Sequence, residues 1–91
     1  MAFVWDGDKA ASNLLTHGIE FEYAIRVFQD LDQYEWVDDR EDYGEVRLNV
    51  VGLVNDVEIL VTYTIRDGNE RIISARRATR YEREEYWRSQ I

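Results

Sequence analysis

The sequence contains no cysteine, no proline and a single histidine, His17. Without cysteine the chain forms no disulfide and has no thiolate nucleophile, which fits a reducing compartment. One histidine leaves too few of the usual ligands for a structural zinc site, so we expect no metal and no other cofactor. No apolar run approaches the roughly 20 residues of a membrane span, and the opening MAFVWDGDKA lacks the pattern of a signal peptide. We therefore expect a cytoplasmic protein without membrane contact.

The apolar content is high enough for one folded domain. Of 91 residues, 45% are hydrophobic and 13% aromatic, which is above the range of disordered chains even though 33% are charged. The sequence has no Gly/Ser linker, low-complexity stretch or internal repeat. We expect a single domain that covers residues 1–91.

The charges are distributed unevenly along a chain whose net charge is -8 at pH 7. Residues 1–45 hold three basic against twelve acidic residues, whereas residues 46–91 hold eight arginines against seven acids. Five of these arginines lie in RIISARRATRYERE, residues 71–84. An acidic protein repels nucleic acid at long range, so binding would need such a local patch. Two interpretations stay open: a phosphate-binding surface, or a solvated strand end and helix face.

Capping residues and apolar spacing predict three helices. Asp6 is placed to cap a helix over 7–17, and Gly18 is placed to end it. Thr79 and Glu82 have the form of a capping box that opens the last helix, RYEREEYWRSQ. In the second helix, EFEYAIRVF, one buried stripe is predicted at the i, i+3, i+4 and i+7 positions Phe21, Ala24, Ile25 and Phe28.

The remaining segments read as strands. FVW and YEWV are short strand candidates, and the alternating runs VRLNVVGLV and VEILVTYTIR are joined by Asn55 and Asp56, which tolerate a tight hairpin turn. A second turn, DGN, leads into ERIISARRA. In the middle strand one alternating face is apolar and packs helices, while the other is only partly apolar. The prediction is an α+β domain with an antiparallel sheet, two N-terminal helices and one C-terminal helix.

Arginine, carboxylate, tyrosine and one histidine are the groups available for chemistry, because no metal motif, Walker loop, Rossmann fingerprint or nucleophile elbow is present. Arginine presents a planar fork of donors that suits phosphate oxygens. RNA cleavage without a metal needs a base for the 2′-hydroxyl, a cation for the charge on phosphorus and an acid for the leaving oxygen. These residue types supply all three.

Each candidate also has a structural interpretation. His17 stands at a helix end, where the exposed carbonyls favour positive charge. Glu45 and Arg47 share a strand face and would form an ordinary ion pair. Arg76 and Arg77 point to opposite faces of their strand, so one at most joins a given site on the sheet. Tyr86 on the last helix is as suited to packing as to stacking on a base.

Three motifs together resemble a known family. They are W-D-x-x-K-A-x-x-N with a His-Gly turn, then GEVRLNVVG, then R-I-I-S-A-R-R-A followed by Glu82 and Tyr86. Over residues 3–86 their order and lengths resemble the BrnT family of type II toxins, which have a RelE-like ribonuclease fold. The resemblance implies an endoribonuclease that cleaves RNA without a metal and arrests growth.

The resemblance also implies partners and site residues. The expected partner is a BrnA-like antitoxin with a ribbon-helix-helix part, in a heterotetramer that contacts operator DNA only through the antitoxin. The expected catalytic residues are His17, Glu45, Arg66, Arg76 and Tyr86. The expected RNA-binding residues are Lys9, Arg47, Arg77 and Arg80. Among them Glu45 or His17 would be the base, Arg66 and Arg76 would clamp phosphate, and Tyr86 would donate or stack.

Two positions differ from the family pattern. Thr16 stands where a lysine usually precedes the histidine, and Ile65 where a glutamate usually precedes the arginine. These differences favour a second reading, in which the chain is an attenuated or non-catalytic module whose arginines meet an acidic protein segment.

Overall fold

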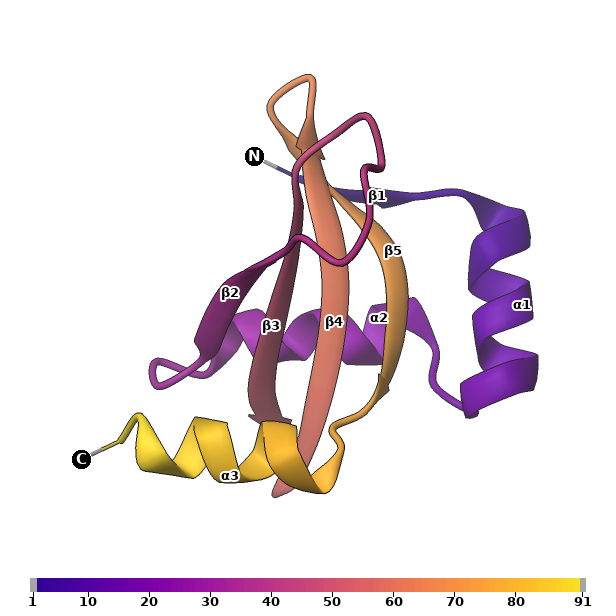
Figure 1. Ribbon diagram of the computed structural model, residues 1–91. Helices are drawn as coiled ribbons and strands as arrows, with labels where there is room; N and C mark the ends of the chain where they lie inside the picture. Colours follow the sequence, from indigo (N-terminus) through magenta and orange to yellow (C-terminus); the bar gives the residue numbers. More distant parts are fainter. Residues whose placement is uncertain (1, 91) are drawn as a thin grey trace.

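A computed structural model describes residues 2–90 (Figure 1). Its elements follow the predicted order of strand, two helices, four strands and helix, which confirms the α+β prediction. A 3₁₀ helix, η1, continues the second helix. The elements are β1 (Phe3–Trp5), α1 (Gly7–His17), α2 (Phe21–Ala24), η1 (Ile25–Gln29), β2 (Tyr34–Asp38), β3 (Arg47–Val54), β4 (Val57–Arg66), β5 (Asn69–Arg77) and α3 (Arg80–Arg88). None of the helices within residues 2–90 is long and apolar enough to cross a membrane.

The sheet has the strand order β1-β5-β4-β3-β2 and is mixed. Strands β2 to β5 form the predicted antiparallel meander, but β1 pairs with β5 in parallel, with Val4 opposite Arg71. A hairpin forces its two strands to be antiparallel, whereas β1 is separated from β5 by most of the chain and is under no such constraint. The prediction of a wholly antiparallel sheet was therefore wrong at this edge.

The predicted caps and turns are present. The Asp6 side chain accepts a hydrogen bond from the Asp8 N–H at 2.7 Å, and Gly18 ends α1 with a φ of 71°. Thr79 and Glu82 form the reciprocal capping box of α3. Both residues of the hairpin turn between β3 and β4 have positive φ, as the tight turn requires (Asn55 and Asp56).

The second helix departs from the predicted stripe after its first turn. Phe21 and Ala24 are fully buried as predicted, yet the most buried residue of η1 is Val27, which the α-helical spacing did not select. A 3₁₀ helix has three residues per turn, so Val27 lies directly above Ala24 on the core side. Val27 packs on Gly52 of β3, where a Cβ atom would lie 2.8 Å from the Val27 carbonyl oxygen.

Gly52→Ala is therefore expected to destabilise the protein. The added methyl group would overlap the backbone of η1, which must shift, and overpacking of this kind costs about 1–3 kcal/mol. Urea denaturation followed by circular dichroism measures the loss. Gly7→Ala is the matched control, because a Cβ atom there meets nothing within 4 Å. Equal stability of the two variants would contradict the close contact.

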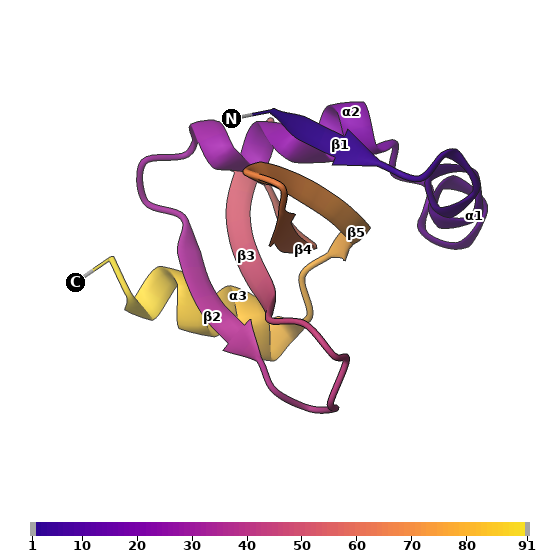
Figure 2. The same cartoon turned by 90° about the horizontal axis from the view of Figure 1, so that it is seen from above.

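Helices cover both faces of the sheet. Figure 2 shows α2 and α3 on opposite sides of it, with α1 beside the β5 edge. On the α2 side the core is built around Phe21, Val61 and Ile72. On the α3 side a smaller cluster contains Leu60 and Tyr86, together with other residues of β3 and of the segment before α3. The face predicted to be partly apolar is thus divided into an apolar part under α3 and a polar part beyond it.

The Glu70 carboxylate is partly buried in a place that destabilises its charged form. Glu70 Oε2 is buried without a hydrogen-bond partner among the described residues, and burial together with the nearby Glu35 carboxylate raises the pKa of Glu70. Glu35 itself accepts a hydrogen bond from the Tyr63 hydroxyl at 2.5 Å.

Glu70→Gln is expected to stabilise the protein by about 1 kcal/mol at pH 7. A raised folded-state pKa means that the Glu70 contribution to stability is full below its unfolded pKa and is lost as pH rises through the folded value. The gain should therefore shrink as the pH is lowered from 7 to 4. Denaturation midpoints across this range test it, and a gain that grows on acidification would contradict the assignment.

Candidate functional site

Arginines from three strands lie on one face of the sheet, the face that α3 partly covers. Arg47 is opposite Thr64, and Arg76 is opposite Leu60. Alternate residues of β4 share a face, so Leu60, Thr64 and Arg66 point the same way, and Arg47 and Arg76 point with them. Arg77 is opposite Ile59 and belongs to the other face, as the alternation predicted.

A β-bulge at Ile73 adds a further arginine to this face. Thr62 pairs with Ser74 while Tyr63 pairs with Ile72, so Ile73 is an extra residue in β5. Without the bulge, Arg71 and Arg76 would point to opposite faces because they are five residues apart. The sequence contains no signal for this shift, and the placement of Arg71 was not predicted.

Glu45 holds two of the arginines together at one end of the face. Its carboxylate accepts hydrogen bonds from Arg66 at 2.8 Å and from Arg47 at 3.2 Å. The Arg47 guanidinium also lies 4.0 Å from the centre of the Tyr43 ring. Arg66 and then Arg47 lower the pKa of Glu45, so this carboxylate is ionised and a weak base.

Arg76 forms a second cluster further along the sheet. It binds Glu82 with two parallel hydrogen bonds of 2.7 and 2.9 Å. Because Leu60 and Arg66 are six residues apart on β4, Arg76 and Arg66 are separated by roughly 20 Å. The structure therefore does not bring Arg66 and Arg76 to one phosphate, and they would contact different parts of an extended ligand.

A groove of about 200 Å³ opens beside Arg76. The Arg40 guanidinium binds the buried Asp38 carboxylate on one wall, with two hydrogen bonds of 2.8 Å. Inside it the Asn49 side chain accepts a hydrogen bond from the Thr62 hydroxyl at 2.7 Å. The lining residues are Trp36, Val37, Asp38, Asp39, Arg40, Asn49, Arg76, Tyr81 and Glu82.

Asn13 fixes α1 against the edge of β5. Beyond the short β1, Ala75 has no neighbouring strand on its outer side. There the Asn13 side chain donates to the Ala75 carbonyl at 2.9 Å and accepts from its N–H at 3.0 Å. Lys9, Asn13 and His17 are spaced by four residues and share one helix face. Asn13 therefore holds both predicted site residues of α1 at this edge.

The α1 edge forms a hollow of about 210 Å³ that includes Lys9, Thr16, His17 and Ser74. Ser74 precedes Arg76 by two residues and shares its sheet face, about 7 Å along the strand. No hydrogen bond within residues 2–90 occupies the His17 ring. The structure thus places His17 and Lys9 at the β5 edge beside Ser74, whereas the Glu45 cluster joins residues of β3 and β4.

Tyr86 is part of the core. It is 1% exposed, and its hydroxyl donates to Asp30 Oδ2 at 2.5 Å, an oxygen that also accepts from the Leu53 N–H at 2.9 Å. Burial and then the Asp30 carboxylate raise the pKa of Tyr86. A ring so enclosed does not stack on a base, and it fastens α3 to the sheet. Arg80 is exposed and pairs with Glu84, at 3.1 Å.

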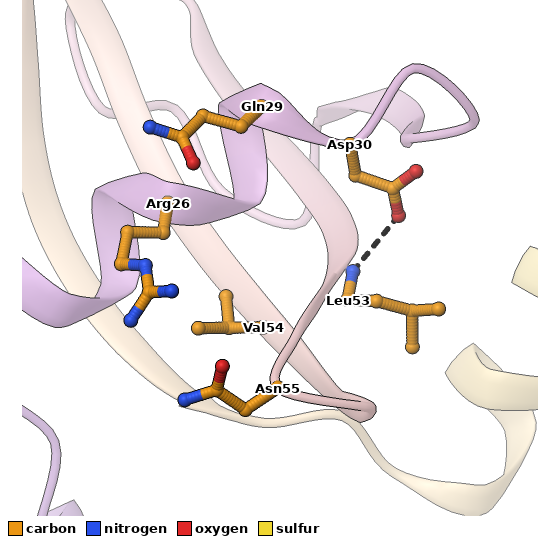
Figure 3. Close-up of a pocket in the computed structure, with 6 residues that line it drawn as sticks. All are labelled: Arg26, Gln29, Asp30, Leu53, Val54 and Asn55. Carbon is orange, nitrogen blue, oxygen red and sulfur yellow. Dashed lines mark hydrogen bonds between the residues drawn. The ribbon is translucent and has the colours of Figure 1, made fainter.

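A separate hollow of about 260 Å³ lies between η1 and the end of β3 (Figure 3). Figure 3 shows the Asp30 carboxylate directed at the Leu53 N–H, with Arg26, Gln29 and Asn55 around the opening. None of the predicted site residues lines it. Asp30 already accepts hydrogen bonds from Leu53 and Tyr86, so its carboxylate links η1 to β3 and α3. We therefore assign this hollow a structural role.

Two aromatic residues were missed. Trp36 and Tyr81 line the groove beside Arg76, and the Tyr81 side chain is 69% exposed. The alternation in YEWVD does place Tyr34, Trp36 and Asp38 on one strand face, and this signal could have pointed to Trp36.

Among residues 2–90, no three or more His, Asp or Glu side chains are grouped closely enough to hold a metal ion.

Comparison with known families gives a match over most of the chain. The sequence model of a family described as "Ribonuclease toxin, BrnT, of type II toxin-antitoxin system" matches residues 5–82. The matched region contains Lys9, His17, the Glu45 cluster and Arg76 with Glu82, but not Tyr86. No curated protein matches the sequence.

Proposed function

The chain belongs to the BrnT family of ribonuclease toxins of type II toxin-antitoxin systems, and from this premise we propose that its arginine-bearing sheet face binds and cleaves RNA without a metal. The observation that carries the proposal is that Arg47, Arg66 and Arg76 lie on the same face of the sheet. The guanidinium group of arginine suits phosphate oxygens. Three arginines spread along the sheet could contact successive phosphates of an extended RNA strand.

The proposed reaction is attack by the RNA 2′-hydroxyl oxygen on the adjacent phosphorus. A base takes the hydroxyl proton, the bond from phosphorus to the 5′-oxygen breaks, and an acid gives that oxygen a proton. The products are a 2′,3′-cyclic phosphate and a free 5′-hydroxyl. Arg76 stabilises the negative charge that builds up on the phosphate oxygens.

His17 is the better candidate for the proton-transferring group. Glu45 has a lowered pKa and is bonded to Arg47 and Arg66, which leaves it little capacity to accept a proton. His17 lies in the hollow with Ser74, which precedes Arg76 by two residues on β5, and histidine is the side chain that most often acts as a general acid or base. In this proposal the Glu45 carboxylate binds Arg47 and Arg66 in the free protein, and an RNA phosphate replaces it when RNA binds.

Glu45→Gln separates these roles. If Glu45 only shields Arg47 and Arg66, its neutralisation should strengthen RNA binding about threefold to tenfold and preserve cleavage. If it were the base, cleavage should fall by about 10²–10⁴. Filter binding and cleavage of one labelled RNA measure both quantities, and the second result would remove the assignment to His17.

Cleavage in the presence of a chelator tests the proposed function as a whole. Purified protein should cleave total RNA equally well with and without EDTA, and induced expression should arrest growth. Cleavage that stops in EDTA and returns with a divalent cation would contradict the metal-independent reaction. RNA that stays intact under both conditions would contradict nuclease activity.

We further propose that a BrnA-like antitoxin with a ribbon-helix-helix part covers the arginine face, in a heterotetramer that binds operator DNA through the antitoxin. The family is named as one of a toxin-antitoxin pair, which supports an antitoxin partner. A negatively charged antitoxin segment would replace RNA phosphates on Arg47, Arg66 and Arg76. Co-expression and light scattering would give the stoichiometry, and an antitoxin that binds without blocking RNA would contradict the shared face.

A second candidate function is a non-catalytic module that acts through protein binding. It is favoured by Thr16, which lines the hollow beside His17, and by Ile65, which is 57% exposed next to Arg66. Neither supplies the charge that the family pattern has there. Thr16→Lys with Ile65→Glu would create cleavage in an inactive wild type if this candidate is correct.

A further inference from the structure

A hollow of about 230 Å³ lies between β2 and α3, next to the groove beside Arg76. Figure 2 shows these two elements side by side. The lining residues are Tyr34, Trp36, Tyr81, Glu82 and Glu85. Three aromatic rings and two carboxylates at one opening are an unusual combination, and no step of the cleavage reaction uses them.

This hollow and the groove beside Arg76 adjoin each other. Trp36, Tyr81 and Glu82 line both of them. Arg76 lines the groove only, Tyr34 lines the hollow only, and Trp36 and Tyr81 lie where the two meet. A ligand with an anionic group and a flat ring would reach Arg76 with the first and the aromatic rings with the second.

The rings are positioned by the backbone, with Tyr81 exposed and with Tyr34 and Trp36 half-buried against the core cluster under α3. Tyr34 and Trp36 are alternate residues of β2 on one face, with ring centres 5.5 Å apart and planes inclined by 38°. Tyr81 lies in the first turn of α3, whose capping box fixes that turn. Its 69% exposure leaves a large ring with little to pack against, and such rings are platforms for unpaired bases.

The carboxylates determine which base edge fits. Both Glu82 oxygens are bonded to Arg76, and one of them also accepts from the Thr79 N–H. Glu85 is bonded through Oε1 to Arg88, and within residues 2–90 no hydrogen bond occupies its Oε2. A carboxylate only accepts, so it matches adjacent donors. Guanine presents N1–H and N2–H₂ side by side, whereas uracil flanks its one donor with two carbonyls.

We propose that the hollow of Tyr34, Trp36 and Tyr81 is a nucleobase subsite that takes an unpaired guanine, with Glu85 on its Watson–Crick edge. The subsite rests on the proposed ribonuclease function and adds a sequence preference to it. A nucleotide whose phosphate is on Arg76 places its base, or that of its neighbour, in the hollow. The enzyme then cuts next to guanine in single-stranded RNA.

A basic side chain of a protein partner is the other occupant to consider. Glu82 is neutralised by Arg76 and Glu85 is paired with Arg88, so the hollow has little net negative charge. The Arg76 guanidinium at the open end repels a second cation. The balance of charge therefore favours a neutral ring.

Binding of non-cleavable RNA tests the subsite. The probes are 2′-O-methyl hexanucleotides, oligouridine with and without one central guanosine, titrated against the wild-type chain. The guanosine probe should bind at least tenfold tighter. Tyr81→Ala and Glu85→Gln should each reduce this ratio to below threefold, whereas Trp87→Phe, outside the hollow, should preserve it. Tyr81 is exposed, so its replacement should leave the circular dichroism spectrum unchanged.

The outcomes separate the subsite from the proposed function. Equal binding of the two probes, with total RNA still cleaved, would overturn the subsite alone. Guanosine preference without any cleavage would keep the subsite and overturn the nuclease. Tyr81→Ala that weakens antitoxin binding but leaves the guanosine ratio unchanged would assign the hollow to a basic protein side chain and overturn the subsite.

Discussion

Arg76→Ala should lower RNA cleavage by a factor of about 10² to 10³, the usual effect of removing one group that stabilises transition-state charge. Arg76 lines the aromatic groove, lies two residues from Ser74 of the His17 hollow, and presents two parallel donors. Cleavage rates on one labelled RNA at saturating enzyme measure the effect. Arg76→Lys should also be impaired, because an ammonium group keeps the charge and loses the fork.

Arg77→Ala is the matched control for this prediction. Arg77 is adjacent in sequence and has the same charge, but it points to the opposite face of the sheet. Its replacement should leave cleavage within about threefold of wild type, because it changes only the long-range field. Equal losses in the two variants would show that bulk charge, and not the sheet face, carries the activity.

The folding of the Arg76 variant needs its own measurement. Glu82 is bonded to Arg76 and caps α3, so alanine at 76 leaves a half-buried carboxylate with one partner fewer. We expect a loss of stability of about 1–3 kcal/mol, which leaves a folded protein at 25 °C. Unchanged circular dichroism would assign lost cleavage to the site. A variant that unfolds would require Glu82→Gln with Arg76→Ala as the background.

The charge distribution of the sequence takes on a different meaning in the folded chain. The acidic residues of the first half and the arginines of the second are not two separate surfaces. Glu45 is bonded to Arg47 and Arg66, and Glu82 is bonded to Arg76. RNA must exchange these internal carboxylates for phosphates, so the protein's own acids set the affinity of the arginine face.

Local rules predicted most of the elements. The Asp6 cap, the capping box at Thr79 and the turn at Asn55 depend on residues within four positions of each other, and their chemistry is legible in the sequence. The α-helical stripe failed at Val27, because the chain tightens to a 3₁₀ helix where η1 packs on Gly52. That close approach is a tertiary contact with no local signal.

The candidate site depended more on long-range geometry. The alternation of side chains correctly predicted that Arg76 and Arg77 point to opposite faces. The bulge at Ile73, which brings Arg71 to the Arg76 face, could not be predicted from the sequence. Tyr86 has the same residue type whether it stacks on RNA or bonds to Asp30, and only its burial decides between them. Arg66 and Arg76 were both predicted to bind phosphate, but sequence spacing carries no measure of the distance between them along the sheet.

Asn13→Ala should have the largest effect on stability, a loss of about 2–5 kcal/mol. The Asn13 side chain is 6% exposed and donates to the carbonyls of Ile19 and Ala75, at 3.0 and 2.9 Å. It also accepts from the Ala75 N–H, so it makes the hydrogen bonds that a neighbouring strand would otherwise make at this edge. Alanine leaves all three backbone groups without partners in a buried place. Thermal and urea unfolding measure the loss.

Leu15→Ala is the control, because Leu15 is 90% exposed on the same helix and should change stability by no more than about 0.5 kcal/mol. A small effect of Asn13→Ala would mean that water replaces the side chain at the β5 edge. The variant also links stability to activity, since Asn13 holds α1, and thereby His17, at the β5 edge. Assayed at a temperature where it is still folded, Asn13→Ala should cleave RNA more slowly than Leu15→Ala. Equal rates would show that His17 acts independently of the α1 edge and would return Glu45 to consideration as the base.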